Sequence, residues 1–237
     1  MRNRYLAYDL IRKGKFTPPQ KMVAVEEASS RREVVINWWC KQSGKSLTAI
    51  KMITDLIKKS DKVAVLIVKN ISSKNMMINL LEKSIPKDAI LRINSNVIIL
   101  KNGSCIKVIT SMDNSDNYKV LMKLTLTTAD LFIVDEFDYL DDTQMDHIID
   151  AVKGRRKLNM IGRLLRRWGI FPNKKILFFS SMKDRRNFEL LVLSVGDEAA
   201  FTYLNYQKLG LEKEKLVKIL GENTFKRDYD SYFPLYT

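Results

Sequence analysis

The chain of 237 residues is 46% hydrophobic, which is enough to bury a core and excludes a disordered protein. Its 41 Lys and Arg outnumber 27 Asp and Glu, and the net charge of +14 favours a polyanionic partner, either nucleic acid or an anionic membrane. The apolar runs are far shorter than the roughly 20 residues of a membrane-spanning helix. Two cysteines and one histidine exclude a disulfide framework and an ordinary zinc site. We therefore expect a soluble, intracellular protein with no secretory signal.

The first predicted elements are an extended entry segment, a helix, a strand and a second helix. Residues 1–20 are basic and end in Thr-Pro-Pro-Gln, which is typical of extended chain, and residues 21–30 are expected to be helical. Residues 34–39 are β-branched and aromatic, which predicts a buried strand. Across residues 46–57 apolar side chains recur at helical spacing, which predicts a helix.

A second buried strand, a helix and a hairpin come next. The strand is predicted over residues 63–68, and the helix over residues 71–81, with Pro86 soon after its end. Residues 96–100 and 105–109 flank Lys-Asn-Gly-Ser, and an Asn-Gly pair between such runs favours a type I′ turn.

The later apolar runs complete the predicted sheet. Residues 131–134 and 175–179 predict the third and fourth buried strands, with a helix near residues 145–152 between them. Strands that alternate with helices are typical of an α/β domain with a largely parallel central sheet.

The last part of the chain is expected to be mostly helical, over residues 189–193, 197–206 and 212–220. We therefore predict a core over residues 1–186 and a small helical C-terminal subdomain over residues 187–237.

The sharpest motif lies between the first predicted strand and the helix that follows it. In a phosphate-binding loop, Gly44 lets the backbone approach a phosphate, Lys45 reaches the β- and γ-phosphates, and the Ser46 hydroxyl binds Mg²⁺. The usual first glycine of this pattern is Trp39 here, and a Gly-Lys-Ser sequence can also simply begin a helix. The motif comprises Cys40, Lys41, Gln42, Ser43, Gly44, Lys45 and Ser46.

A second motif begins ninety residues after Lys45, where the third strand runs directly into two acids, Asp135 and Glu136. This is the Walker B arrangement, in which Asp135 would hold Mg²⁺ through water and Glu136 would activate the attacking water. Acids also end strands without any catalytic role. The two motifs in this order and context favour an NTPase, and the adjacent glutamate favours a hydrolase over a kinase.

A pair of serines, Ser180 and Ser181, ends the fourth strand. Their hydroxyls could hydrogen-bond a γ-phosphate or the attacking water, although serine is also an ordinary residue for a turn.

Together these residues resemble the ATPase part of viral terminase large subunits, the motors that package DNA into procapsids. That family has a similar phosphate loop that often lacks the first glycine, an adenine-contacting glutamine upstream, matched by Gln20, and a hydroxyl-rich coupling motif, matched by Ser180 and Ser181. Many members also carry an Asn-Gly-Ser segment before Walker B, as at residues 102–104. The resemblance covers about residues 17–205.

The resemblance implies a RecA-like (ASCE) P-loop fold that binds ATP and Mg²⁺. By this resemblance the catalytic residues would be Glu136, Lys45 and Lys41, the metal ligands Ser46 and Asp135, and the coupling residues Ser180 and Ser181. ATP would also contact Gln20 and residues 40–47, with Leu47 at the end of that range. The implied partners are double-stranded DNA without base specificity, a portal protein and a small terminase subunit. The active form would be a homo-oligomeric ring in the host cytoplasm, with monomers allowed for isolated chains and no membrane partner.

Three features depart from the family pattern. Lys41 replaces the usual arginine and lacks its planar fork, and residues 124–128 offer no arginine finger before Walker B. The chain is also too short for the family's C-terminal nuclease, so no nuclease activity is expected. Asp228 and Asp230 are interpreted as solvated residues of the tail.

A strongly basic stretch lies between residues 151 and 186, with twelve Lys and Arg and the single acid Asp184. Clustered cations of this kind favour contact with nucleic-acid phosphates, although the arginines could instead reach the ATP of a neighbouring subunit. The DNA-binding or arginine-finger candidates are Arg155, Arg156, Arg163, Arg166 and Arg167.

The function predicted from the sequence is that of an ATP-hydrolysing DNA-packaging motor. One alternative is another DNA-dependent ATPase, such as a helicase-like translocase, although a helicase normally carries a second RecA-like domain. The other is a DNA-binding assembly module whose ATP site is vestigial.

Overall fold

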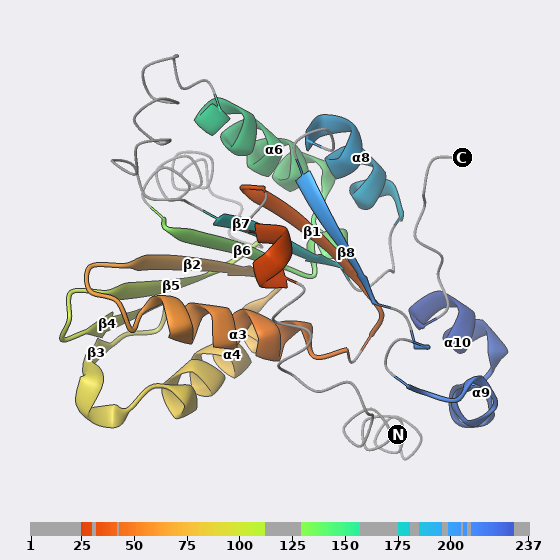
Figure 1. The fold of residues 1–237 in the computed structure, drawn as a ribbon, viewed down its shortest axis with the longest axis horizontal. Coiled ribbons are helices and arrows are strands. Elements are labelled where there is room, and N and C mark those ends of the chain that lie inside the picture. Colours follow the sequence, from red (N-terminus) through yellow and green to blue (C-terminus); the bar gives the residue numbers. More distant parts are fainter. Residues whose placement is uncertain are drawn as a thin grey trace.

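The computed structural model of the chain describes residues 25–29, 32–41, 43–111, 129–156, 175–180, 185–195, 199–204, 206–207 and 210–229. These residues build one sheet of eight strands in the order β3-β4-β5-β2-β6-β7-β1-β8. Helices α3 and α4 lie together on one side of the sheet, α6 and α8 lie together on the other, and α9 and α10 form a pair beyond the end of β8 (Figure 1). None of the described helices is long and apolar enough to cross a membrane.

The elements have the following bounds. The strands are β1 (Val34–Trp39), β2 (Val63–Val68), β3 (Ile90–Ile93), β4 (Val97–Leu100), β5 (Cys105–Thr110), β6 (Leu131–Asp135), β7 (Lys175–Ser180) and β8 (Ala199–Leu204). The helices are α3 (Lys45–Leu56), α4 (Ile71–Ser84), α6 (Asp142–Arg156), α8 (Arg185–Val195), α9 (Lys213–Leu220) and α10 (Glu222–Asp228). Two short 3₁₀ helices are η1 (Lys87–Ala89) and η2 (Phe137–Tyr139), and residues 25–29 are also helical.

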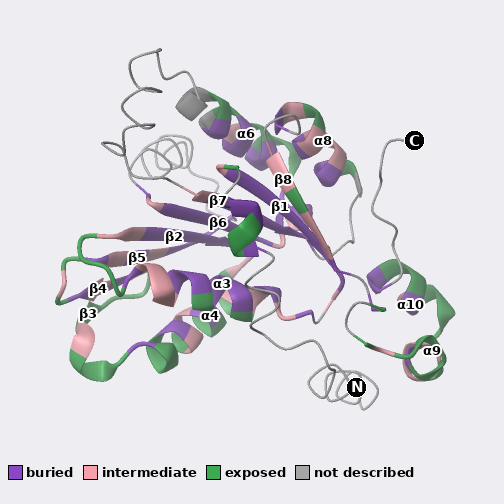
Figure 2. Ribbon diagram, viewed as in Figure 1, coloured by how far each residue is buried: buried purple, intermediate pink, exposed green. Residues whose placement is uncertain are grey.

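The predicted α/β architecture with a mainly parallel sheet is confirmed. In the spatial order of the sheet, every pair of neighbours between β5 and the edge strand β8 is parallel. The antiparallel pairs are β3 with β4 and β4 with β5, at the other edge. The central strands β1 and β6 are buried at every position (Figure 2), because helices cover both faces of the sheet. This burial explains why their sequences are apolar without the alternation of a half-exposed strand.

The strand order places the two motifs at one edge of the sheet. One strand, β7, separates β1 from β6, and all three run in the same direction. The loops that follow β1 and β6 therefore leave the sheet at the same carboxyl edge, where α/β proteins bind their ligands.

The hairpin between β4 and β5 is confirmed, but the predicted type I′ turn is wrong. A type I′ turn needs positive φ at both central residues, whereas Gly103 (φ 84°) is the only residue of this hairpin with positive φ. Asn102 instead turns its side chain towards the end of α3, where its amide donates to Ile57 O at 2.8 Å and to Lys59 O at 3.3 Å. The Asn-Gly-Ser segment thus caps a helix in this structure.

The helix predicted over residues 197–206 is also wrong. Residues 199–204 form the edge strand β8, which pairs in parallel with the whole of β1. Thr202 explains this pairing, because its hydroxyl donates to Asn37 Oδ1 at 2.6 Å and accepts from Trp39 Nε1 at 2.7 Å. Both partners are buried, so these bonds satisfy polar groups that would otherwise lose water without compensation.

The structure contains further elements that were not predicted, namely β3 and α10. The division between a core ending at residue 186 and a C-terminal subdomain stays a prediction. Beyond that boundary, however, β8 joins the central sheet and α8 packs against α6, so that α9 and α10 are the described helices outside the two layers.

We predict that Thr202→Val lowers the free energy of unfolding by about 2–3 kcal/mol, because the isosteric change leaves the amide of Asn37 and the indole of Trp39 each short of a buried partner. Urea-induced unfolding measures the loss. Thr143→Val, on the exposed first turn of α6, is the matched control. An equal stability for Thr202→Val and wild type would contradict the bonding of β8 to β1.

Candidate active site

The loop after β1 turns sharply into α3 at Gly44. Gly44 has φ 87° and ψ 25°, a left-handed conformation that glycine adopts without the penalty of a Cβ atom. The first turn of α3 carries no acidic residue, and among the described residues no side-chain hydrogen bond caps its start at Gly44. Its free N–H groups and positive dipole end therefore face the loop, which is the arrangement that binds phosphate in other helix-start loops.

Lys45 is held beneath this loop. Its side chain is buried, and Nζ donates to Cys40 O at 3.1 Å and to Trp39 O at 3.4 Å. Both acceptors are neutral carbonyl groups, so in the described part of the chain this ammonium has no hydrogen-bonded carboxylate. A phosphate at the loop would give this ammonium a hydrogen-bonded anion, in addition to its attraction to the Asp135 carboxylate.

A hydrogen bond joins the two motifs. Ser46 Oγ donates to Asp135 Oδ2 at 2.9 Å, although the residues are 89 positions apart in the chain. Asp135 is only 7% exposed, and its other oxygen, Oδ1, has no hydrogen-bond partner among the described residues. A buried carboxylate oxygen without a donor costs free energy, which a cation bound beside it would recover.

The electrostatics of Asp135 point in the same direction. Burial, followed by repulsion from Glu136, raises the pKa of the Asp135 carboxyl to about 6, against the opposing attraction of Lys45 and the hydrogen bond from Ser46. A divalent cation favours the ionised carboxylate and reverses this shift.

The residues present fit Mg²⁺ held with a nucleotide. Magnesium in NTPases is bound by one or two protein oxygens together with substrate phosphates, and not by a cage of side chains. Ser46 and Asp135 would supply those oxygens, while the described residues contain no cluster of three or more His, Cys, Asp or Glu that could hold a metal alone.

Glu136 adopts a strained backbone conformation. Its φ of 54° and ψ of 47° are left-handed, a region that costs a residue with a side chain about 1–2 kcal/mol. The following turn, η2, is fixed from α8, where the buried amide of Asn187 donates to Leu140 O at 2.8 Å and to Phe137 O at 3.3 Å. Packing therefore holds the candidate general base in place at the end of β6.

Lys41 is bound by the C-terminal helix α10. Its Nζ donates to Asp228 Oδ2 at 2.8 Å, and its backbone N–H donates to Asp228 O at 2.9 Å. The interpretation of Asp228 as solvated is wrong, because the residue is only 3% exposed. Although burial opposes its ionisation, hydrogen bonds from Arg227 and Lys41 hold the pKa of Asp228 below its usual value.

The structure also brings Lys69 and Tyr139 to this edge, and neither was predicted from the sequence. Lys69, which follows β2, places its Nζ 3.4 Å from the ring centroid of Tyr139 in η2. Neither residue belongs to a motif, and only the parallel order of β2 and β6 makes them neighbours.

The other predicted site residues are placed as follows. Cys40 and Ser43 are buried in the loop, and the N–H of Cys40 donates to Leu204 O at 2.8 Å. Ser180 is buried at the end of β7, in register with Trp38 of β1. Leu47 is 56% exposed on α3.

Several candidates cannot be placed. Arg155 and Arg156 end α6, but only their backbone is described. The remaining candidates outside the described residues are Gln20, Gln42, Ser181, Arg163, Arg166 and Arg167.

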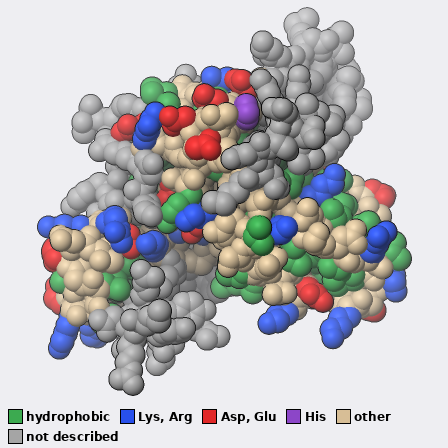
Figure 3. All heavy atoms as spheres, turned by 180° about the vertical axis from the view of Figure 1, so that it is seen from behind, with side chains coloured by type: hydrophobic (Ala, Val, Ile, Leu, Met, Phe, Trp, Pro, Cys, Tyr) green, Lys and Arg blue, Asp and Glu red, His purple; other side chains and the backbone are tan. Residues whose placement is uncertain are grey.

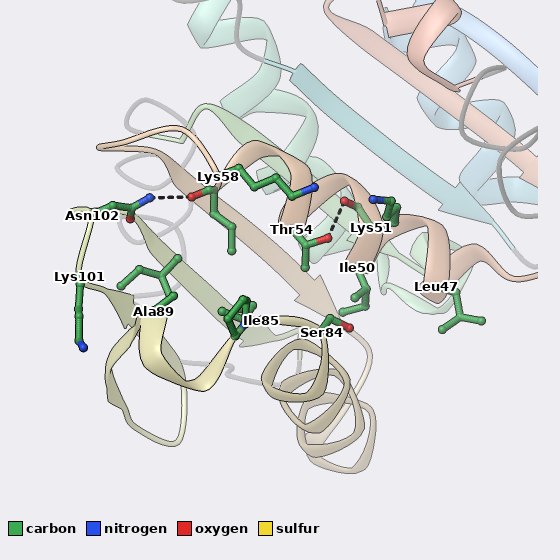
Figure 4. Close-up of a pocket in the computed structure, with 13 residues that line it drawn as sticks. Leu47, Ile50, Lys51, Thr54, Lys58, Ser84, Ile85, Ala89, Lys101 and Asn102 are labelled. Atoms are coloured by element: carbon green, nitrogen blue, oxygen red, sulfur yellow. Dashed lines mark hydrogen bonds between the residues drawn. The ribbon is translucent and has the colours of Figure 1, made fainter.

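A surface cavity of about 650 Å³ lies away from these motifs, between the outer side of α3, the end of α4 and the β4–β5 hairpin (Figure 4). Its floor is apolar, with Ile50 and Ile85, and Leu47 lies at its edge nearest the phosphate loop. No residue of the Walker B strand lines it, and Leu47 is the one predicted ATP-contacting residue in its lining.

The described surface of α6 carries several acidic side chains. Acidic side chains gather around His147 (Figure 3), where Asp142, Asp146 and Asp150 are exposed on α6. Most of the basic stretch between residues 151 and 186 lies outside the described residues, so a DNA-binding role for it stays a prediction.

Comparison with known proteins finds similar folds among solved structures but no match at the level of sequence. No protein-family model matches the sequence, and no curated protein matches it either. The ATPase domain of the large terminase of Thermus phage P74-26 has a TM-score of 0.60 at 12% identity, over 94% of this chain and 95% of that one. The large terminase of a thermophilic bacteriophage, solved in complex with ADP, has a TM-score of 0.57 at 11% identity, over 86% of this chain and 49% of that one.

A helicase shares the same core. The Escherichia coli DEAH/RHA helicase HrpB has a TM-score of 0.51 at 13% identity, over 77% of this chain and 21% of that one. The predicted RecA-like fold, and its likeness to terminase ATPase domains, are therefore confirmed. The chain spans about half the length of the bacteriophage terminase solved with ADP.

We predict that Asp135→Asn raises the free energy of unfolding of the Mg²⁺-free protein relative to wild type, and that this gain is about 1–3 kcal/mol larger at pH 8 than at pH 4. Because the folded-state pKa is raised to about 6, the wild-type carboxyl stabilises the fold below its unfolded pKa and loses that contribution as the pH rises through about 6. Asparagine does not ionise, so the variant does not lose stability in this way as the pH rises. Urea unfolding at both pH values measures the difference, and Asp146→Asn makes the same charge change on the exposed face of α6. If the variant and wild type differed in free energy of unfolding by the same amount at pH 4 and pH 8, the desolvation of Asp135 would be contradicted.

Proposed function

We propose that this chain is a Mg²⁺-dependent ATPase that drives DNA translocation in a viral packaging motor. The observation that carries the proposal is the contact between Ser46 and Asp135, which joins a phosphate-binding loop to a Walker B acid. The RecA-like fold shared with terminase ATPase domains supports it.

Each residue has a distinct role in the proposed reaction. Lys45 and the N–H groups around Gly44 bind the β- and γ-phosphates, and Ser46 with Asp135 would hold Mg²⁺. The metal supplies charge neutralisation on the phosphate oxygens. Glu136 orients the attacking water and accepts its proton. The proposed role of Ser180, at the end of the strand between β1 and β6, is to respond to the loss of the γ-phosphate.

Translocation of double-stranded DNA is proposed for the basic stretch between residues 151 and 186, which contacts phosphates without reading bases. A homo-oligomeric ring, a portal protein and a small terminase subunit complete the proposed assembly, and the host cytoplasm is the proposed location.

A helicase-like translocase is the second candidate, favoured by the fold shared with a DEAH/RHA helicase. Separation of a forked duplex by the purified protein distinguishes it from a packaging motor, which moves intact double-stranded DNA. If the purified protein bound no ATP, the remaining hypothesis would be a DNA-binding assembly module whose ATP site is vestigial.

We predict that Glu136→Gln lowers the ATP turnover number by about 10²–10⁴-fold, because the amide cannot accept the proton of the attacking water. ATP affinity should stay within a few-fold of wild type, since Lys45, Ser46 and Asp135 are unchanged. Steady-state phosphate release and equilibrium nucleotide binding measure the two quantities. Asp146→Asn is the matched control for loss of one acid. Full turnover by Glu136→Gln would remove Glu136 from the mechanism.

We predict that replacing Arg163, Arg166 and Arg167 together by alanine weakens binding to double-stranded DNA and reduces the slope of log affinity against log salt by about 3, because each phosphate contact contributes about 0.9. Fluorescence anisotropy at several salt concentrations measures the slope. Replacement of the exposed Lys83, Lys87 and Lys101 changes the net charge equally and should leave the slope closer to wild type. Equal slopes for the two triple variants would place the DNA contact elsewhere.

A further inference from the structure

The phosphate loop of the candidate site carries a lysine, Lys41, and no described arginine. Lys41 is a point charge, and an ammonium cannot grip a phosphate through two parallel N–H bonds as a guanidinium does. The structure places an arginine beside it, Arg227, which lies near the end of α10 and belongs to no sequence motif.

Arg227 and Lys41 share one carboxylate. Arg227 Nε donates to Asp228 Oδ1 at 2.7 Å and Nη2 donates to Asp228 Oδ2 at 3.2 Å, while Lys41 Nζ donates to the same Oδ2 at 2.8 Å. The backbone bond from Lys41 N to Asp228 O, at 2.9 Å, fixes the end of α10 to the phosphate loop. The guanidinium is therefore held next to the loop by a buried acid.

A weaker electrostatic effect on Arg227 comes from the turn that follows β6. The pKa of Arg227 is raised chiefly by the hydrogen bond to Asp228, and to a smaller extent by Tyr139, which lies three residues after Glu136. Tyr139 is the residue whose ring packs against Lys69. The hydrogen bonds through Asp228 thus hold the Arg227 side chain at the loop that follows β1.

Arg227 keeps donors available for a ligand. A guanidinium has five N–H donors, and two of them are used in the hydrogen bonds to Asp228. Its side chain is 53% exposed, whereas that of Asp228 is 5% exposed. The carboxylate can therefore hold the guanidinium from the protein side while its other N–H groups face solvent.

We propose that Arg227 is an arginine finger supplied within the chain, which contacts the γ-phosphate of ATP beside Lys41, with Asp228 as its positioning residue. The inference rests on the proposed ATPase function. Charge on the γ-phosphate oxygens must be stabilised in the transition state, and a planar, bidentate cation does this better than an ammonium. Arg227 in this way replaces the guanidinium that position 41 lacks.

The test compares Arg227→Ala and Arg227→Lys with Lys226→Ala, a matched control. Lys226 is the neighbouring cation on α10, its side chain is 65% exposed, and its described ion pair is with Glu222 at 3.5 Å. The dissociation constants of ADP and of a non-hydrolysable ATP analogue are measured for each variant with Mg²⁺, together with the ATP turnover number.

Arg227→Ala is expected to weaken binding of the ATP analogue about 10–100-fold relative to ADP, the range for hydrogen bonds between charged groups, and to lower turnover by at least as much. Arg227→Lys should lie between alanine and wild type, because it keeps the charge but loses the fork. Lys226→Ala should match wild type in both quantities.

A mixing experiment separates action within the chain from action on a neighbour. Arg227→Ala and Glu136→Gln subunits are each expected to be slow, and a mixture stays slow if Arg227 serves the site of its own chain. Recovered turnover in the mixture would show that the arginine acts on the next subunit and would overturn the assignment.

The remaining outcomes are also decisive. An unchanged ratio of ATP-analogue to ADP affinity in Arg227→Ala, whether both are normal or both are weakened equally, overturns the inference and leaves Arg227 a structural residue. Wild-type protein that neither binds nor hydrolyses ATP overturns the proposed function together with the inference. Wild-type protein that hydrolyses ATP, with Arg227 variants equally fast, overturns the inference alone.

Discussion

The hydrogen bond between Ser46 and Asp135 is the interaction on which the rest of the site depends. It requires β1 and β6 to end at the same edge of the sheet, with only β7 between them. The same contact holds a carboxylate in a place where water cannot solvate it, and one of its oxygens has no hydrogen-bond donor among the described residues. A cation bound beside Asp135 would offset this penalty, because it would restore the electrostatic interactions that burial removes.

The chain around this contact is held by long-range hydrogen bonds. Asn187 fixes the turn after Glu136, and Thr202 bonds β8 to the strand that carries the phosphate loop. Asp228 holds Lys41 from a helix near the end of the described chain. Each of these side chains is contributed by the last third of the sequence, so elements from that part of the chain hold the loop and the turn of the candidate site in place.

The elements that could be predicted from the sequence share one physical property. Strands β1, β2, β6 and β7 are buried along almost their whole length, so each has a mainly apolar sequence without polar alternation, which is typical of a covered, parallel strand. The loop after β1 and the acids after β6 could be predicted for a related reason, since phosphate and magnesium chemistry restrict the residue types and their order. The prediction for residues 197–206 was wrong because a short edge strand and a short helix can have similar spacing of apolar residues. The strand forms here because these residues pair with β1.

By itself, then, the sequence determined the α/β class, the four central strands and the positions of the candidate phosphate loop and Walker B acids, because local patterning and chemistry dictate them. Tertiary structure alone decided that β8 completes the sheet, that Asn102 caps α3 rather than forming a type I′ turn, and that Asp228 is buried against Lys41. Those outcomes depend on hydrogen bonds and ion pairs between residues far apart in the chain, and no local pattern of residues encodes which distant partner a polar side chain will meet.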